Sequence, residues 1–569
     1  MPFIEEVGRA RRTAVVLACL LAFRGAGAQS IRGVVHGAAT GGVLSGVVVV
    51  LRDSASGDLV QTVTNSRGAF VLHAPAAGSY LLRARLIGFR PTDLRFRLSL
   101  GDTTLAVVMS DVPVTFAAVV TRSAGHCRAH PESGSATWAL WDDAEIAMLN
   151  AVITMREQRY RFDAEFVRRW YDMNPAQLSQ IGIHDSTVRD SRPWTSVRPD
   201  VLGRSGYAFE TPTEMTVIAP DLPILLSHDF LDGHCFAIHE ASGRRPELVG
   251  LDFKPTARGR YVDIRGTFWI DRQSSEVRYL DYYYDGFPFS MSDTLAGGRV
   301  KFTRLPTGSW ILSSWWIRSP VPPAPYLAYT VLSTSRPLRA VESGDPHFRA
   351  IEFTVTAGSV RQVSGDGDAD TMPVWSAPVS ALRMNVTEHG ASGPVPAAGA
   401  IVQLVGSRRQ VVADGSGVAV IDGMLEGEYI VDVTAQLQAE LRLPPSRSTV
   451  VVEPPGDVTI HARVMTPGEA VQAVCGAMSM TSGILTGTVT KNGAPEPRAS
   501  VSVRSDVDPH FAKGVKVLSD GTFSVCDVPR GEALTVTAHF GGSAQAKAYV
   551  KLAPDQIHGS VDLVLPPER

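Results

Sequence analysis

The densest group of side chains that could do chemistry is His228-Asp229-Phe230-Leu231-Asp232-Gly233-His234. Its two imidazoles and two carboxylates are ligand types that zinc and other transition metals accept. The spacing, however, matches no metal-binding pattern with a physical basis. The alternative is a helix end followed by a loop, with His234 next to a disulfide cysteine, Cys235. We therefore predict a structural role for this segment and no bound metal.

The chain lacks the sequence patterns of several enzyme classes. Zinc carboxypeptidase chemistry needs a His-x-x-Glu pair, and no histidine here is followed by glutamate three residues later. Gly-x-Ser-x-Gly, the Walker loop and Gly-x-Gly-x-x-Gly are also absent. A Ser–His–Asp set brought together only by folding stays an alternative, since such triads are defined by geometry. The sequence therefore predicts a protein that is not an enzyme and that uses no cofactor.

The acidic run Asp366-Gly367-Asp368-Ala369-Asp370 has the alternating carboxylates of a calcium-binding loop. In such a loop the sixth position is glycine, which makes the sharp turn, and the twelfth is a bidentate glutamate. Here those positions hold Thr371 and Ala377. The run is therefore predicted to be a solvated loop.

Aromatic side chains between residues 269 and 316 are the best candidates for ligand binding. Aromatic faces stack on sugar rings or pack on acyl chains. The alternative is that they fill a core and pair across strands. The predicted binding surface consists of Trp269, Tyr282, Tyr284, Trp310, Trp315 and Trp316.

These aromatic residues lie in a segment, 122–375, whose pattern predicts an α+β domain. A helix over 136–155, capped by Ser133 or Ser135, has an apolar stripe. An antiparallel meander follows, with its clearest strands at 261–271, 276–284, 299–305 and 310–318. In the second strand two sets of side chains alternate and are expected on opposite faces of the sheet: Tyr279, Asp281 and Tyr283, and Leu280, Tyr282 and Tyr284.

Segments 29–112, 378–465 and 478–566 repeat one pattern: a β-rich opening, a turn that contains glycine, and an aliphatic strand. About seven short strands in roughly 80 residues are typical of a two-sheet sandwich. In the first copy the run 47–51 is apolar at every position, which indicates a strand buried on both faces. The predicted fold class is mainly β, with three β-sandwich domains and a central α+β domain that contains a curved antiparallel sheet.

The first repeat resembles the carboxypeptidase regulatory-like domain. The resemblance rests on Gly33-Val34-Val35, on residues 42–49, on Asn65-Ser66-Arg67-Gly68-Ala69-Phe70 and on residues 86–91. It implies a transthyretin-like sandwich of the kind found beside metallocarboxypeptidases, in TonB-dependent receptors and in many bacterial surface proteins. The third repeat is similar, whereas the second has Val418-Ala419-Val420 where phenylalanine is expected.

One strand of the central segment has a second resemblance. The run Gly266-Thr267-Phe268-Trp269-Ile270-Asp271 is similar to a strand of the lipoprotein-carrier (LolA-like) half-barrels of the periplasm. That resemblance implies a curved sheet with an apolar concave face.

The N-terminus predicts an exported protein. Arg9, Arg11 and Arg12 precede an apolar run and the small residues 26–28, so residues 1–28 are predicted to be a signal peptide. A lipoprotein signal at Leu17-Ala18-Cys19 is the alternative.

The predicted mature chain keeps an even number of cysteines, which in an exported protein suggests disulfides. We predict that Cys475 pairs with Cys526, because both lie in or beside the third repeat. Cys127 is then paired with Cys235. The alternative is that all these thiols are reduced and buried.

Charge and pattern together limit the function. The formal net charge is −3 and basic residues are scattered, which excludes a nucleic-acid-binding footprint. We predict a non-catalytic extracytoplasmic binding or adaptor protein in the periplasm, at the outer membrane or secreted, peripheral to the membrane at most. Its partner would be a cell-envelope protein, glycan or lipid. The alternatives are a surface carbohydrate-binding protein and a hydrolase whose central domain gathers His228, Asp232 and His234.

Overall fold

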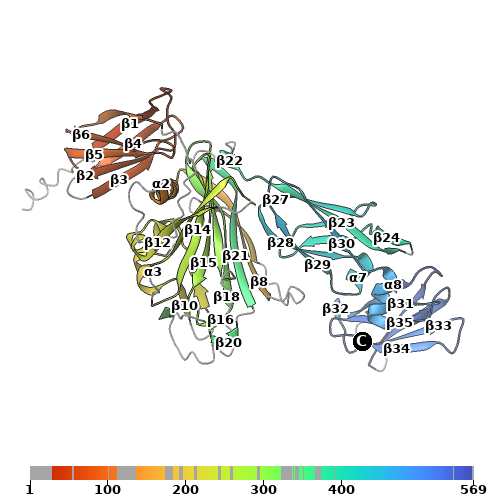
Figure 1. Ribbon diagram of the computed structural model, residues 1–569. Helices are drawn as coiled ribbons and strands as arrows, with labels where there is room; N and C mark the ends of the chain where they lie inside the picture. Colours follow the sequence, from red (N-terminus) through yellow and green to blue (C-terminus); the bar gives the residue numbers. More distant parts are fainter. Residues whose placement is uncertain are drawn as a thin grey trace, which may run out of the picture. The chain divides into compact units, whose positions relative to one another are not determined.

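The chain separates into two compact units, Met1–Ala377 and Pro378–Arg569 (Figure 1). The computed structural model describes residues 29–53, 57–99, 101–111, 136–172, 184–190, 197–210, 215–240, 245–256, 260–290, 295–321, 336–337, 339, 345–349, 352–365, 373–390, 392–541 and 544–566. The described fold is mainly β and most sheets are antiparallel, which confirms the predicted fold class. No helix in these ranges is both long and apolar enough to cross a membrane. The finer division of the chain into separate domains stays a prediction.

The first unit begins with a two-sheet sandwich. One sheet has the order β4 (Ala69–Ala74), β1 (Gln29–Gly37), β7 (Thr103–Met109). The other has the order β3 (Gly57–Val63), β2 (Val48–Asp53), β5 (Gly78–Arg85), β6 (Thr92–Leu98). Strand β1 pairs antiparallel with β4 and parallel with β7. Side chains such as Ile31, Leu51 and Phe70 fill the core between the sheets.

Strand β2 is buried on both faces, as its uninterrupted apolar sequence predicts. Val49 and Leu51 belong to the sandwich core. Val48 and Val50 point the other way and pack in a second cluster with Ile146 of helix α2 (Ala136–Arg156).

The rest of the first unit is built on a ten-stranded sheet. Its main path runs β12 (His234–Glu240), β13 (Leu248–Pro255), β14 (Asp263–Asp271), β15 (Val277–Asp285), β17 (Gly297–Arg304), β18 (Trp310–Val321), β21 (Glu352–Gly365), β8 (Tyr160–Asp172), β9 (His184–Asp190), and β22 (Trp375–Ser376) pairs with β21. Two smaller sheets complete the described strands: β11 (Met215–Val217), β10 (Ala208–Glu210), β19 (Arg336–Pro337), and β16 (Phe289–Ser290), β20 (Asp345–Arg349).

One face of the large sheet forms the main core of this unit, and we call it the core face. Helices α2, α3 (Pro199–Ser205), α4 (Leu222–Leu225) and α5 (His228–Gly233) contribute side chains that pack on it. Trp141 of α2, for example, lies 5.1 Å from the ring of Phe236 and 5.9 Å from that of Phe268. The apolar face expected from the lipoprotein-carrier resemblance is therefore covered by the protein's own helices.

Glycines make room for aromatic rings on this core face. A Cβ atom added to Gly298 would lie 2.7 Å from the ring carbon Cζ of Tyr282. The same holds for Gly358, where it would lie 2.9 Å from the indole of Trp315. Each ring therefore occupies the space above a glycine on the next strand, which only a missing side chain provides.

Helix α2 also joins the first sandwich to the large sheet. The side chain of Asn150 is fully buried and bridges the two parts. Its Nδ2 donates to the carbonyl of Gly46 over 2.8 Å, and its Oδ1 accepts from the amide of Trp310 over 2.8 Å. Arg85 donates to both Asp142 and Glu145 of α2 over 2.7 Å. Buried polar groups satisfied on both sides fix a packing geometry closely, so we expect these parts to move together.

The second unit contains two more sandwiches with the strand topology of the first. One sheet of the first of these sandwiches contains β24 (Gly393–Pro396), β23 (Ser380–Gly390), β27 (Val418–Met424) and β30 (Val458–Arg463). Its other sheet has the order β26 (Gln410–Val412), β25 (Ile401–Leu404), β28 (Gly427–Thr434), β29 (Ser446–Val452). One sheet of the second sandwich contains β32 (Ala494–Pro495), β31 (Ser482–Lys491), β35 (Thr522–Pro529), β38 (His558–Ser560) and β39 (Leu563–Leu565). Its other sheet has the order β34 (Ala512–Lys516), β33 (Ser500–Ser505), β36 (Ala533–Phe540), β37 (Ala544–Lys551).

The glycine turn found in each sequence repeat has the same structural role three times. Gly68, Gly417 and Gly521 have φ of 69°, 75° and 83°, where a side chain would be strained. Each carbonyl accepts a hydrogen bond from a valine of its sandwich's opening strand, over 2.9, 2.7 and 2.7 Å. The same positive-φ backbone conformation therefore favours glycine at this turn position in all three repeats.

Helix α8 (Pro467–Cys475) connects the two sandwiches of the second unit. A capping box begins it: Thr466 accepts from the amide of Glu469 over 3.1 Å, and Glu469 accepts from the amide of Thr466 over 2.9 Å. A disulfide joins its last residue, Cys475, to Cys526 of β35, and this is the pairing that the sequence predicts. Cys127, the predicted partner of Cys235, lies outside the described residues, as do residues 1–28.

Candidate binding surface

The face of the large sheet opposite the core carries charged and aromatic side chains, and we call it the polar face. One row crosses five strands, because strand register places these residues side by side: Asp252, Thr267, Asp281, Arg299 and Trp316. All of them are half-buried. The row is therefore open to a ligand along its length while its side chains are held by their neighbours.

Hydrogen bonds fix the acidic members of this row. The hydroxyl of Thr267 donates to Asp252 over 2.6 Å, and His239 Nδ1 lies 3.1 Å from the other oxygen of the same carboxylate. Arg299 donates to both oxygens of Asp281, over 2.6 and 3.0 Å. Bidentate pairs of this kind set the orientation of both partners.

Guanidinium groups lie against rings on the same face. The Cζ of Arg299 is 4.2 Å from the ring centroid of Tyr279, and that of Arg265 is 5.6 Å from the ring of Tyr283. Arg318 lies 5.5 Å from the ring of Trp316. Arg245 also donates to the hydroxyl of Tyr279. Cation–π contacts need this distance range, so the face combines aromatic area with fixed positive charge.

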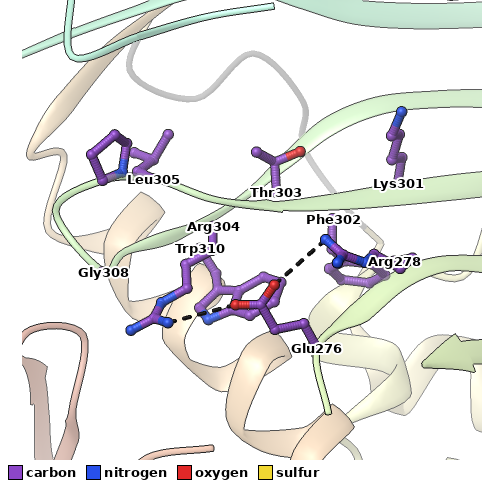
Figure 2. A pocket seen from close by; sticks show the side chains of 10 residues that line it. Glu276, Arg278, Lys301, Phe302, Thr303, Arg304, Leu305, Gly308 and Trp310 are labelled. Atoms are coloured by element: carbon purple, nitrogen blue, oxygen red, sulfur yellow. Dashed lines mark ion pairs between the residues drawn. The ribbon is translucent and has the colours of Figure 1, made fainter. Parts of the chain in front are cut away.

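A cavity of about 500 Å³ lies where β15, β17 and β18 end near one another (Figure 2). Three of its lining side chains are cationic, Arg278, Lys301 and Arg304, and one is anionic, Glu276. Figure 2 shows Glu276 between the two arginines, and the two ion pairs are both 3.5 Å long. Its apolar lining includes Phe302 and Trp310, whose side chains are almost fully buried.

The cavity continues the polar face. Lys301 lines it and is the register partner of Tyr279, which in turn pairs with Trp269. Arg278 is held at the rim by Asp271, to which it donates over 2.9 Å. Partial burial acts to raise the pKa of Asp271, but hydrogen bonds from Arg278 and from two backbone amides lower it to about 2. Asp271 is thus a stable anchor for one cavity arginine.

A second, smaller cavity of about 150 Å³ surrounds His234. It is lined by Ser227, Asp229 and Asp263, so it is the place to look for a hydrolytic site. Ser227 donates to the carbonyl of Ile224 over 2.7 Å and caps helix α5. The ring nitrogens of His234 lie 2.8 and 3.1 Å from backbone carbonyl oxygens. Both groups are therefore engaged in holding the backbone.

The residues of the hydrolase and metal-binding alternatives are spread out. His228, Asp229 and Asp232 are exposed on α5, whereas His234 is buried. Within the described ranges, no group of three histidine, cysteine, aspartate or glutamate side chains converges as metal ligands would. The acidic run at 366–370 lies outside those ranges.

The predicted aromatic surface is wrong for two of its six members. Tyr282 and Tyr284 are buried in the core, with 0 and 2% of their surface exposed. Trp310 is also almost fully buried, but it lines the larger cavity. Trp315 is half-buried and packs against the core cluster, on the core face. Trp269 and Trp316 alone lie on the polar face. The alternation of side chains on β15 was the right signal, but alternation alone does not show which of the two faces is buried.

Residues that sequence reasoning missed form most of the surface. Arg299, Asp281 and Asp252 come from three strands, and only their register brings them into one row. The cavity arginines likewise come from two strands. A search for charged residues at the positions that alternate with the core would have found Asp281 and Arg299.

Comparison with known proteins now identifies one part of the chain. The family model of the carboxypeptidase regulatory-like domain matches residues 30–110. These residues are a carboxypeptidase regulatory-like domain. No curated protein matches the sequence at a significant level, and the lipoprotein-carrier resemblance of the central segment stays a prediction.

Several solved structures resemble parts of the chain. The 5-hydroxyisourate hydrolase of Klebsiella pneumoniae is 21% identical over 15% of this chain and 92% of its own, with a TM-score of 0.13. The shaft pilin SpaA of Lactobacillus rhamnosus GG is 10% identical over 34% of this chain and 100% of its own, with a TM-score of 0.14. The Bacillus anthracis TIE protein is 9% identical over 62% of this chain and 63% of its own, with a TM-score of 0.15. Scores this low support no inference about function.

The carboxypeptidase regulatory-like domain reaches the candidate site directly. A Cβ on Gly308, which lines the larger cavity, would lie 2.6 Å from the amide nitrogen of Gly46 in that domain. Asn150 completes the contact by binding both Gly46 and Trp310. The domain therefore buttresses one wall of the cavity.

Proposed function

We propose that this chain is a non-catalytic extracytoplasmic recognition protein that binds its partner on the polar face of the large sheet. The row of Asp252, Thr267, Asp281, Arg299 and Trp316 carries this proposal. Its side chains are half-exposed, and neighbouring groups already fix their orientation. Binding to such a surface costs little conformational entropy, because its side chains are ordered in advance.

The charges on this face are paired in a way that supports binding and gives no support to catalysis. Asp281 is bound by Arg299, and Asp252 accepts from Thr267. A general acid or base needs a titrating group within reach of a substrate proton. In the smaller cavity, Ser227 and His234 both bind backbone carbonyl groups. His234 Nε2 also lies 3.4 Å from a carboxylate oxygen of Asp263, but the backbone contacts of Ser227 and His234 make recognition the better supported function.

An extracytoplasmic location fits the chemistry of the chain. Disulfides such as Cys475–Cys526 persist mainly in oxidising compartments. The predicted signal peptide at 1–28 leads to the same proposal. The partner would then be a component of the cell envelope, and aromatic and arginine side chains are the residue types that dominate binding energy at such surfaces.

Cosedimentation with isolated cell envelopes tests this function. The chain from residue 29 onward should pellet with envelopes, and Trp316→Ala should reduce the bound fraction at least about tenfold. Tyr549→Ala is the matched control, because Tyr549 is an aromatic residue of the second unit with 77% of its surface exposed. Equal binding by the original protein and Trp316→Ala would refute the polar face as the binding surface.

A further inference from the structure

The larger cavity differs in charge from the row beside it. Its lining contains Arg278, Lys301 and Arg304 against one carboxylate, Glu276. The whole chain, by contrast, has a net charge of −3. A local excess of positive charge in a partly enclosed space attracts an anion more strongly than the same charges would on an open surface.

The internal carboxylate leaves the arginines able to bind a ligand. Glu276 lies 3.5 Å from both Arg278 and Arg304, which is longer than a good charged hydrogen bond. Arg304 and Arg278 keep 40 and 47% of their side-chain surface exposed. Arg304 can therefore turn its N–H groups towards an incoming carboxylate or phosphate without breaking a tight pair, while Arg278 stays anchored by Asp271 and presents its remaining N–H groups.

The residues beside the cavity on the polar face limit the class of molecule that can carry this anionic group. Asp281 and Asp252 stand on the same face, and Trp269 and Tyr279 follow Lys301 in register. Nucleic acid or an anionic membrane would be repelled by those carboxylates, because such partners present negative charge along their whole length. Carboxylates accept hydrogen bonds from hydroxyl groups, and aromatic rings stack on sugar faces.

We infer that the cavity receives an anionic sugar, so that the partner is an acidic polysaccharide whose neutral residues extend along the polar face. This inference rests on the proposed function and adds the chemical class of the ligand. The cavity volume of about 500 Å³ lies within the range of small-ligand sites. The guanidinium groups bind the carboxylate or phosphate of one residue, and Asp281 and Asp252 accept from the hydroxyl groups of its neighbours.

Binding of defined polymers to the chain from residue 29 onward tests the inference. Hyaluronan, in which acidic residues alternate with neutral ones, is compared with its fully methyl-esterified form, which has the same backbone without charge. Phosphorylated dextran is compared with dextran, which separates phosphate from carboxylate. We expect at least one charged polymer to bind about tenfold more tightly than its neutral form, with affinity that falls as salt increases.

Two variants then assign the effect to the cavity. The double variant Lys301→Gln, Arg304→Gln should lose about tenfold in affinity for the charged polymer. Glu276→Gln should bind it more tightly by about threefold, because the carboxylate that lines the cavity is removed; a misfolded protein would not gain affinity. The double variant Arg67→Gln, Arg504→Gln removes the same charge from exposed positions elsewhere and should bind as the original protein does.

The outcomes separate the inference from the function on which it rests. If neutral polymers bind as tightly as charged ones, or if Glu276→Gln weakens binding, the anionic class is wrong. If no polymer binds but envelopes still cosediment through Trp316, the recognition function stands and the ligand class falls. If neither polymers nor envelopes bind, both proposals fail.

Discussion

The two faces of the large sheet use aromatic residues in opposite ways. On the core face, Tyr282 and Trp315 lie over glycines of the next strand. On the polar face, the rings of Tyr279 and Trp316 lie against guanidinium groups. Each core-face ring occupies the space above a glycine, whereas on the polar face Arg299 of the next strand holds Tyr279 and Arg318 of the same strand holds Trp316. The role of an aromatic residue in a strand can therefore be predicted only when its neighbours in the sheet are known.

The first way to test this contrast is to truncate matched residues on the two faces. Phe268 and Thr267 are adjacent on β14, and Phe268 is fully buried. Phe268→Ala should lower the free energy of unfolding by about 3–5 kcal/mol, because it leaves a cavity in the core. Thr267→Ala should cost about 0.5–1.5 kcal/mol, the value of one hydrogen bond.

Urea unfolding followed by tryptophan fluorescence measures both values. All nine tryptophans lie between residues 138 and 375, so the signal reports on the part of the chain that contains the large sheet. Equal costs for the two substitutions would mean that the two faces do not differ in burial as described.

A second prediction concerns the helix that covers the core face. Burial and the nearby charge of Asp142 raise the pKa of Asp143 on α2 to about 7. The folded protein therefore holds a proton there that the unfolded chain loses near pH 4. Stability should fall as the pH rises from about 4 to about 7 and then level off, because the folded state binds more protons within that window.

Asp143→Asn should remove this part of the pH dependence. The variant should be more stable than the original protein at pH 8 by about 2–4 kcal/mol and nearly unchanged at pH 4. Burial also raises the pKa of Asp221 to about 7, so some slope should remain. Asp111→Asn, at an exposed position, should leave the profile as it is. A variant that loses stability at pH 8 would show that the carboxylate is needed in its charged form.

Sequence patterns predicted the helix and the strands but not which residues of neighbouring strands lie side by side. The strands predicted at 261–271 and 276–284 are found at Asp263–Asp271 and Val277–Asp285, and the helix predicted at 136–155 is Ala136–Arg156. Period-two alternation also separated Tyr282 from Asp281 correctly. It gave no information on which residue of β17 lies beside each of them, because register is a property of the pair of strands.

The cavity could not be predicted from the alternation of side chains, for a related reason. The ladder between β14 and β15 shifts at Trp269/Ile270, and that between β17 and β18 shifts at Lys301/Phe302. Such irregularities re-aim side chains, so residues near them no longer follow the alternation of the strand. Arg278 and Lys301 lie at these points, and their convergence depends on both shifts.

A third prediction tests the space that glycine provides on the core face. A Cβ added to Gly298 would lie 2.2 Å from the carbonyl oxygen of Trp316 and 2.5 Å from the hydroxyl of Tyr282. Gly298→Ala should therefore displace the Tyr282 ring and cost about 1–3 kcal/mol in urea unfolding. Gly365→Ala, where the added atom meets nothing within 4 Å, is the control and should change stability little. A neutral Gly298→Ala would show that the ring does not depend on that space.

The last and smallest stability effect belongs to the polar face. Arg299→Gln removes the bidentate pair with Asp281 and the contact with Tyr279, yet both members of the ion pair are partly exposed to solvent. Partly exposed ion pairs contribute little, so the expected cost is below about 1 kcal/mol. Binding to envelopes should nevertheless fall at least about tenfold, because Asp281 loses its fixed orientation and the row loses its central cation. A large loss of stability with unchanged binding would reverse the contrast and make the polar face a structural layer. The expected result, little change in unfolding with loss of binding, separates a surface kept for recognition from one kept for folding.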